Sequence, residues 1–160
     1  AIVRALADEF FAGEGARAGA FLHGAAGEAD VLLLPAASAC ADDLRGADGY
    51  LFVCPENLAG LSGAMKEFFD SSYYPLLGQI EGRPYASLIC AGSDGEGAAR
   101  QIARIATGWR LKAVAEPLII RTGAQTAEAI AASKTLSDMD RARCTERGAL
   151  LAAGLSMGVF

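Results

Sequence analysis

Short apolar runs alternate along this chain with stretches of helical periodicity. The runs cover residues 31–34, 50–54, 85–91 and 118–120. Between them apolar residues return every three or four positions, as Ile102, Ile105 and Ala106 do after Gly97. Strands that alternate with helices form β-α-β units, whose strands are parallel. The pattern predicts an α/β fold of three layers, with helices on both faces of a parallel sheet.

The size and composition of the chain fit one domain. Its 160 residues, of which 52% are hydrophobic, can bury one substantial core. We find no internal repeat, low-complexity tract or linker in the sequence. A single domain over residues 1–160 is therefore expected.

The charge and the cysteine content of the chain indicate which binding partners and which cellular compartment to expect. The net charge is −5, so no basic excess is available for nucleic acid or an anionic membrane surface. The longest apolar tract, residues 150–160, is too short to span a bilayer. Four cysteines without C-x-x-C spacing fit a reducing cytoplasm. One histidine and scattered cysteines do not suggest a metal site.

The mean hydropathy of the chain is +0.28, which is high for so small a protein. Apolar surface that water does not tolerate alone is typically covered by a second protein surface. We therefore expect a homodimer, the default on symmetry grounds, or a homotetramer.

Residues 48–70 carry the strongest functional signal. A buried strand over 50–54 is expected to break at Pro55, and a polar loop from Glu56 to Gly60 leads to an amphipathic helix opened by Ser62. In open α/β sheets small ligands bind outside the carboxyl ends of the strands, where such loops expose backbone N–H groups. The stretch predicts one wall of a ligand site, although an ordinary strand-to-helix turn has the same residues.

A second Gly-rich loop follows the run 85–91. Ser93, Asp94 and Gly95 precede Gly97 and the next helical pattern. Glycines allow a planar ligand to approach the main chain closely. The alternative interpretation is a helix-capping turn in which Asp94 complements the helix dipole.

The start of the chain combines two patterns. Residues 1–3 resemble the end of an apolar strand, whereas residues 4–11 have the composition and spacing of a helix. A strand cannot pass into a covering helix without a turn. Either loop residues are absent between Val3 and Arg4, which we favour, or the first element is a helix that begins near Ile2.

These motifs together resemble one family. Residues 50–70, the loop from Ala91 to Ala98 and the segment Arg4–Asp8 are similar to the third strand and helix, the fourth-strand loop and the first helix of flavodoxin-like proteins of the NAD(P)H-dependent FMN reductase type. The resemblance implies a five-stranded parallel sheet in the order 2-1-3-4-5, with FMN between strands 1 and 3. It also implies a phosphate-binding loop after strand 1, the part that is expected to be missing between Val3 and Arg4.

The same resemblance implies the site and the activity. The cofactor-binding residues would be Pro55, Glu56, Asn57, Leu58, Gly60, Ser62, Gly92, Ser93, Asp94, Gly95 and Gly97. No catalytic side chain is required, because hydride transfer is the chemistry of the flavin. The implied protein is an FMN-binding oxidoreductase with NAD(P)H as co-substrate and a small-molecule electron acceptor, a flavin or a quinone. A flavodoxin-like electron carrier, or a non-catalytic flavin-binding protein, is the alternative.

Three further features of the sequence were considered as functional sites. Tyr73 and Tyr74, in a predicted insertion from Ser71 to Gly82, could form a lid over the flavin, an oligomer contact or ordinary packing. Arg83 and Arg110 could meet a nicotinamide phosphate or remain solvated. The match of residues 154–158 to a G-x-S-x-G nucleophile elbow is excluded as a hydrolase site, since no acid and histidine follow it.

Overall fold

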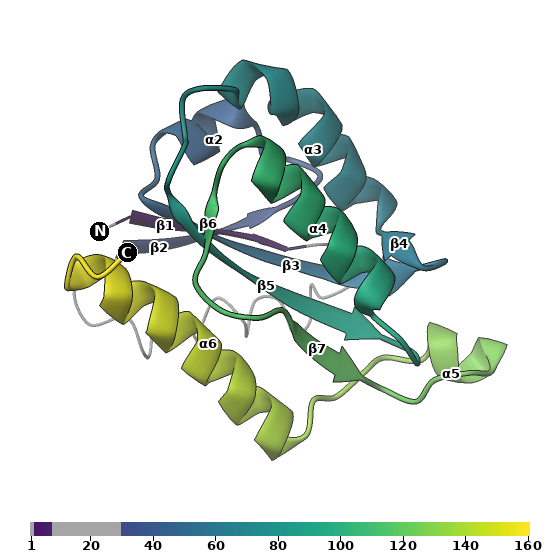
Figure 1. Cartoon of the computed structure of the whole chain (residues 1–160). Helices are drawn as coiled ribbons and strands as arrows, with labels where there is room; N and C mark the ends of the chain where they lie inside the picture. The colour runs from purple at the N-terminus through teal and green to yellow at the C-terminus, as the bar shows by residue number, and fades with distance from the viewer. Residues whose placement is uncertain (1, 8–29) are drawn as a thin grey trace.

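A largely parallel sheet lies between two helical layers in the computed structural model, which describes residues 2–7 and 30–160 (Figure 1). In this part of the chain the strands are β1 (Ile2–Ala7), β2 (Asp30–Pro35), β3 (Gly49–Asn57), β4 (Gly60–Leu61), β5 (Pro84–Ala91), β6 (Lys112–Ala113) and β7 (Leu118–Arg121). They form one sheet in the order β2-β1-β3-β5-β6, with β7 also paired to β5. All pairings are parallel except that of β3 with β4. The predicted α/β architecture is confirmed.

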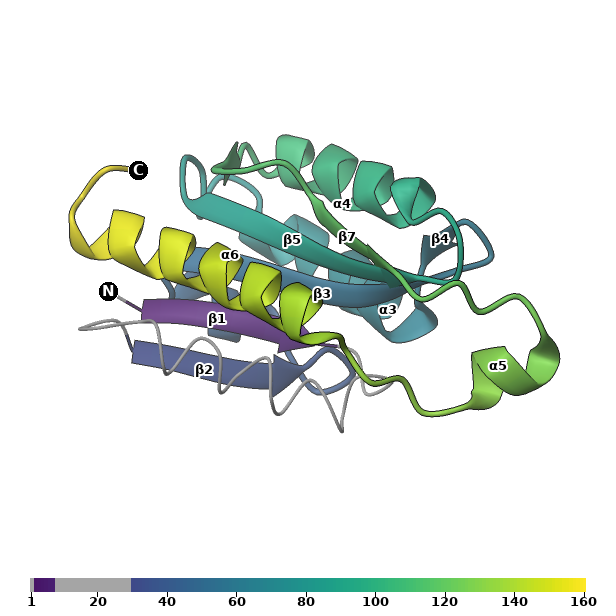
Figure 2. The same ribbon diagram turned by 90° about the horizontal axis from the view of Figure 1, so that it is seen from below.

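The helices cover the two faces unequally. They are α2 (Ala41–Arg45), α3 (Gly63–Leu76), α4 (Glu96–Gly108), α5 (Ala127–Ala131) and α6 (Asp138–Ser156). α2, α3 and α4 lie on one face of the sheet, and α6 lies across the other (Figures 1 and 2). α5 projects from the end of β7, and none of its side chains is buried.

Alternation along β3 explains why the chain has two cores. Tyr50 and Phe52 point into the cluster formed with α2, α3 and α4, and the side chains between them, Leu51 and Val53, enter the cluster formed with α6. Successive side chains of a strand face opposite sides of the sheet. β3 and β5 lie inside the sheet with helices on both faces, which is why their apolar runs are continuous.

The first strand is where the sequence-based expectation was wrong. Residues 2–7 form one continuous strand, paired with β2 throughout and with β3 from Val3 to Ala7. There is no break, and hence no missing loop, between Val3 and Arg4. The backbone hydrogen bonds of two neighbouring strands override the helix-favouring composition of this segment. Residues 8–11 of the expected helix lie outside the described residues.

Two other boundaries differ from the prediction. β3 does not break at Pro55, because Pro55 still pairs with Cys90 of β5 and the strand continues to Asn57. The expected insertion from Ser71 begins within the last turns of α3, which end at Leu76. The fifth strand of the implied order is present as two pieces, β6 and β7, both paired to β5.

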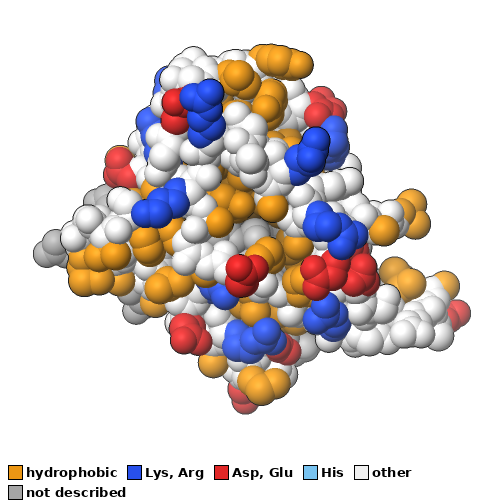
Figure 3. All heavy atoms as spheres, in the orientation of Figure 1, with side chains coloured by type: hydrophobic (Ala, Val, Ile, Leu, Met, Phe, Trp, Pro, Cys, Tyr) orange, Lys and Arg blue, Asp and Glu red, His pale blue; other side chains and the backbone are white. Residues whose placement is uncertain are grey.

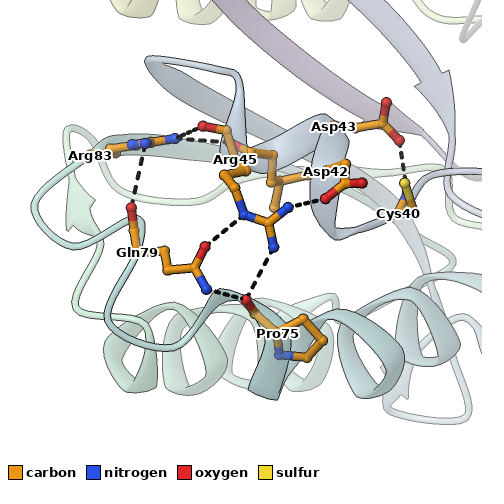
Figure 4. A network of polar contacts seen from close by, with 8 residues as sticks. Cys40, Asp42, Asp43, Arg45, Pro75, Gln79 and Arg83 are labelled. Atoms are coloured by element: carbon orange, nitrogen blue, oxygen red, sulfur yellow. Dashed lines mark hydrogen bonds and ion pairs between the residues drawn. The ribbon is translucent and has the colours of Figure 1, made fainter.

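Arg83 fixes the junction between α2 and the end of α3. Its Nη1 lies within hydrogen-bond distance of the carbonyl oxygens of Leu44 (2.9 Å), Arg45 (2.9 Å) and Ala47 (2.6 Å). Arg45 in turn donates to the side-chain oxygen of Gln79 at 2.6 Å (Figure 4). These contacts satisfy carbonyl groups that the end of a short helix leaves unpaired.

Candidate functional site

The end of β3 turns back on itself as a tight hairpin. Asn57 pairs with Gly60 of β4, and Leu58 and Ala59 form the two-residue connection. Both have positive φ angles, 50° and 60°, which β-carbon sterics disfavour in residues other than glycine. The Leu58 side chain is fully exposed. The chain thus holds a strained, projecting turn at the carboxyl edge of the sheet.

The loop after β5 lies beside this hairpin. Ser93 and Asp94 are exposed, and Gly95 is the N-cap of α4 with φ 92°. A side chain at position 95 would overlap the Ile119 side chain, so both the backbone conformation and the available space require glycine there.

A carboxylate joins the two loops. Glu56 Oε2 accepts a hydrogen bond from Gly95 N at 2.6 Å, and its Oε1 accepts from Gly97 N at 2.9 Å and from Ala98 N at 3.2 Å. The first N–H groups of a helix have no partner within the helix, and the helix dipole favours a negative charge beside them. Glu56 therefore supplies the anion for α4 from within the protein and fixes the hairpin against that helix.

A second contact strengthens the same junction. Gln101 Oε1 of α4 accepts a hydrogen bond from Leu61 N of β4 at 2.8 Å. A side chain at position 97 would overlap the Ala59 carbonyl oxygen, so Gly97 lets the hairpin approach the helix. A β-carbon at Gly60 would lie 3.3 Å from the side-chain amide of Gln101.

The glycines of the site serve the packing of the protein itself. A β-carbon at Gly92 would lie 2.6 Å from the carbonyl oxygen of Ala124, in the segment after β7. Gly92 and Gly123 are also joined by a backbone hydrogen bond of 2.8 Å. Contacts within the chain at positions 92, 95 and 97 thus require glycine there, independently of the predicted approach of a ligand.

The structure therefore divides the predicted site residues into two groups. Those that are buried or half-buried within the fold are Pro55, Glu56, Gly60, Ser62, Gly92, Gly95 and Gly97. Ser62 is buried and caps α3, accepting a hydrogen bond from Met65 N at 3.4 Å. Those that are exposed at the edge are Asn57, Leu58, Ser93 and Asp94. The second group is the set that a ligand can reach.

The third loop expected at the site would follow β1, and residues 8–29 lie outside the described residues. Its sequence departs from the family pattern, because no Ser, Thr or Asn occurs between Ala7 and Asp30. That segment therefore has no serine or threonine hydroxyl group that could bind a phosphate. Arg17 is the one Lys or Arg that it contains.

The aromatic and basic residues considered from the sequence lie elsewhere. Tyr73 stacks on Trp109, with ring centroids 5.7 Å apart, and the Trp109 indole N–H donates to the Tyr73 carbonyl at 2.9 Å. They lie toward the end of α3 remote from Ser62, so Tyr73 packs on Trp109 away from the two candidate flavin loops. Arg110 pairs with Glu81 at 3.0 Å, and Arg83 caps α2. Both guanidinium groups thus have partners within the protein.

Two buried thiols lie in β5 and in α6. Burial raises the pKa of the Cys90 thiol, and it raises the pKa of the Cys144 thiol of α6 to about 11. These groups are protonated at neutral pH and are poor nucleophiles. Within residues 2–7 and 30–160 no cluster of His, Cys, Asp and Glu could hold a metal ion. In the same residues, no helix has the length and apolar character that a membrane crossing requires.

Comparison with known proteins places this geometry in a class. The chain is similar in structure to a flavodoxin from the domain Archaea, with 15% identity, a TM-score of 0.73 and coverage of 98% of this chain and 99% of that one. A flavodoxin, WrbA-like protein from Agrobacterium tumefaciens has 17% identity and a TM-score of 0.72, covering 98% and 97%. Rubredoxin oxygen:oxidoreductase from Desulfovibrio gigas has 12% identity and a TM-score of 0.74, and the match covers 99% of this chain and 36% of that one. The fold is flavodoxin-like.

The sequence identifies the family to which the chain belongs within this fold. Residues 22–123, more than half of the chain, match the family model for NADPH-dependent FMN reductase, and the chain belongs to that family. A search among curated proteins found no match.

Proposed function

We propose that this chain binds FMN at the carboxyl edge of its sheet and transfers reducing equivalents from NAD(P)H through the flavin to a small acceptor, such as free flavin or a quinone. One observation carries the proposal: the Glu56 carboxylate ties the β3–β4 hairpin to the start of α4. Two loops that follow neighbouring strands are thereby held in a fixed relation, with their tips exposed. Such preorganisation is what a protein contributes to flavin chemistry.

The exposed groups fit the edge of a planar ring. Asn57 and Leu58 would contact the isoalloxazine from the hairpin, and Ser93 and Asp94 from the loop after β5. The flavin supplies the hydride chemistry when it is bound. The chain needs only to bind and orient it, and the described residues offer a rigid frame for that purpose.

The phosphate of FMN would be held differently from the family pattern. With no hydroxyl or amide side chain of Ser, Thr or Asn between Ala7 and Asp30, the donors available there are backbone N–H groups and the side chains of Arg17 and His23. Backbone N–H groups at the start of a helix bind phosphate without side-chain help.

We also propose that the chain self-associates, as a homodimer or a homotetramer. Support comes from apolar side chains at its surface, among them Tyr74 (81% exposed), Met139 and Met157 (each 70% exposed). Size-exclusion chromatography with light scattering tests this, and a monomer mass at micromolar concentration would contradict it.

The activity is tested by following NADH and NADPH oxidation with a quinone or free flavin as acceptor, with and without added FMN. The proposal predicts oxidation that requires both FMN and the protein. A chain that binds FMN but oxidises neither nucleotide would be an electron carrier, and the oxidoreductase proposal would then be withdrawn.

A further inference from the structure

A positively charged groove runs between α3 and α4, on the side of these helices away from the sheet. A cavity of about 420 Å³ lies there, between Lys66 of α3 and Arg100 and Arg104 of α4. Lys and Arg side chains lie over these two helices in the face shown in Figure 3. Neither the proposed flavin contacts nor the packing of the sheet uses these three residues.

Within the described part of the chain, no acidic group pairs with the positive charges of the two arginines. Lys66 pairs with Asp70 at 2.6 Å, and other surface arginines pair as well, including Arg121 with Glu96 and Arg143 with Asp140. Arg100 and Arg104 have no ion pair or hydrogen bond among the described residues. They stand one helical turn apart, where like charges destabilise a helix by a few tenths of a kcal/mol. The fold itself gains nothing from this arrangement.

The groove opens at the candidate flavin site. Its upper end is lined by Ala59 of the hairpin and Gly97 of α4, the residues that meet at the Glu56 junction. Gln101 forms part of the wall, and its hydrogen bond to Leu61 N fixes that wall to β4. A ligand in the groove would therefore reach the edge where Leu58 projects.

At its other end the groove continues toward an aromatic residue. A second cavity, of about 660 Å³, shares Arg104 and Ile105 with the first and extends to Tyr73 and Gly108. Gly97 and Gly108 are separated by roughly 16 Å along the helix, at 1.5 Å per residue. The surface thus has a flavin-facing end, two unpaired arginines in the middle and a tyrosine at the far end.

We propose that this groove binds the phosphate groups of a nicotinamide dinucleotide, with Arg100 and Arg104 as the phosphate contacts. The guanidinium fork suits phosphate oxygens, and Arg contacts of this kind are among the stronger charge-assisted hydrogen bonds. The nicotinamide would lie toward Ala59 and Gly97, and the adenosine toward Tyr73. This inference rests on the proposed function, because it assigns a binding place to the co-substrate of that reaction.

Binding is tested apart from turnover, by calorimetric titration of NADP⁺ and of 2′,5′-ADP into the protein with and without FMN. The variants are Arg100→Gln, Arg104→Gln and the double variant. The matched control is Arg143→Gln, which removes one positive charge from α6 on the opposite face. We expect the double variant to weaken NADP⁺ binding at least tenfold and the control to leave it unchanged. Because phosphate contacts are screened by salt, the affinity of the parent protein should fall between 50 and 200 mM NaCl.

Three outcomes would overturn the proposal: NADP⁺ that does not bind the parent protein, equal binding by the parent and the double variant, or pyrophosphate that binds at the arginines when NADP⁺ does not. Flavin fluorescence measured on the same variants separates the two proposals. If FMN fails to bind the parent protein while NADP⁺ binds through the arginines, the proposed function fails and the groove assignment stands. An NADPH KM that rises in the double variant, with kcat and FMN affinity unchanged, would support both.

Discussion

At the scale of single residues, Glu56 has the largest structural effect on the site. Its carboxylate accepts three backbone N–H groups at the start of α4 while its own backbone belongs to the hairpin. Removing it leaves N–H groups of Gly95, Gly97 and Ala98 without their acceptor. The hairpin and the helix then lose their shared anchor.

We predict that Glu56→Ala lowers the free energy of unfolding by about 2 kcal/mol, in the range for loss of a helix cap and of hydrogen bonds to a charged group. FMN affinity should fall with it, since the two loops would no longer be held together. Urea unfolding and flavin titration measure the two effects. Glu67→Ala, on the exposed side of α3, is the control, and an equal loss in both variants would contradict the role of Glu56.

The Cys144 thiol gives the chain a pH-dependent stability at alkaline pH. Its pKa is raised from 9.0 to about 11 by burial in the core beneath α6. Below pH 9 the thiol is protonated in both the folded and the unfolded state. Between pH 9 and 11 the unfolded state loses the proton and the folded state retains it, so the free energy of unfolding decreases as pH rises.

The corresponding measurement is unfolding by urea from pH 8 to pH 11, on the parent protein and on Cys144→Ala. The variant should be less stable at pH 8 but should lose less stability over this range. The raised pKa of Tyr50 and Tyr85, due first to burial, leaves some dependence above pH 10 in both proteins. Identical slopes in the parent and the variant would show that Cys144 does not titrate as described.

At the scale of elements, the β3–β4 hairpin holds two non-glycine residues in a disfavoured backbone conformation. A two-residue connection with both φ angles positive is usually Asn-Gly, whereas this chain has Leu58 and Ala59. Such a cost at an exposed edge is typical of a segment that serves a function other than stability.

The double substitution Leu58→Asn and Ala59→Gly should stabilise the fold by about 1 kcal/mol, because asparagine and glycine adopt the left-handed conformation of this turn with less strain. If Leu58 contacts the flavin, the same variant should bind FMN less tightly than the parent. Thermal unfolding measures the change in stability, and fluorescence titration measures the change in FMN affinity. A destabilised variant would mean that the turn is not strained.

The elements also show what the sequence could and could not predict. The strands β2, β3, β5 and β7 were predicted because buried parallel strands are continuous apolar runs, α3 because Ser62 caps it, and α4 because Ile102, Ile105 and Ala106 recur at helical spacing. β1 was predicted to end at Val3, and its continuation to Ala7 was missed, since Arg4, Ala5 and Leu6 favour a helix unless two strands flank them. The break between β6 and β7 depends on pairing with β5, which no local pattern encodes.

The two loops of the candidate site were located from the sequence, but the contacts that join them were not. The loops at 55–62 and 92–97 were located from Pro, Gly and Ser punctuation at strand ends. The side chain of Glu56 was missed, because its partners lie 39 to 42 residues away along the chain. Ligand approach was the reason predicted for the glycines at 92, 95 and 97; the contacts with Ala124, Ile119 and Ala59, which also require glycine, could not be read from the sequence.

At the scale of the whole molecule, the fold accounts for the place of the site. The sheet order puts β1 between β2 and β3, so the chain passes from one side of β1 to the other, and ligands of open α/β sheets bind at this switch point. α3 and α4 begin at the same edge, which brings the arginine groove and the hairpin together. The flavin-facing loops and the opening of the proposed dinucleotide groove thus lie at the same edge of the sheet.

The central claim is that the loops at this edge bind FMN, and a fluorescence titration of FMN with the purified protein tests it most directly. The account predicts saturable quenching at one FMN per chain, with weaker binding by Glu56→Ala and unchanged binding by Glu67→Ala. Unquenched flavin at all protein concentrations, from a chain shown by circular dichroism to be folded, would contradict it.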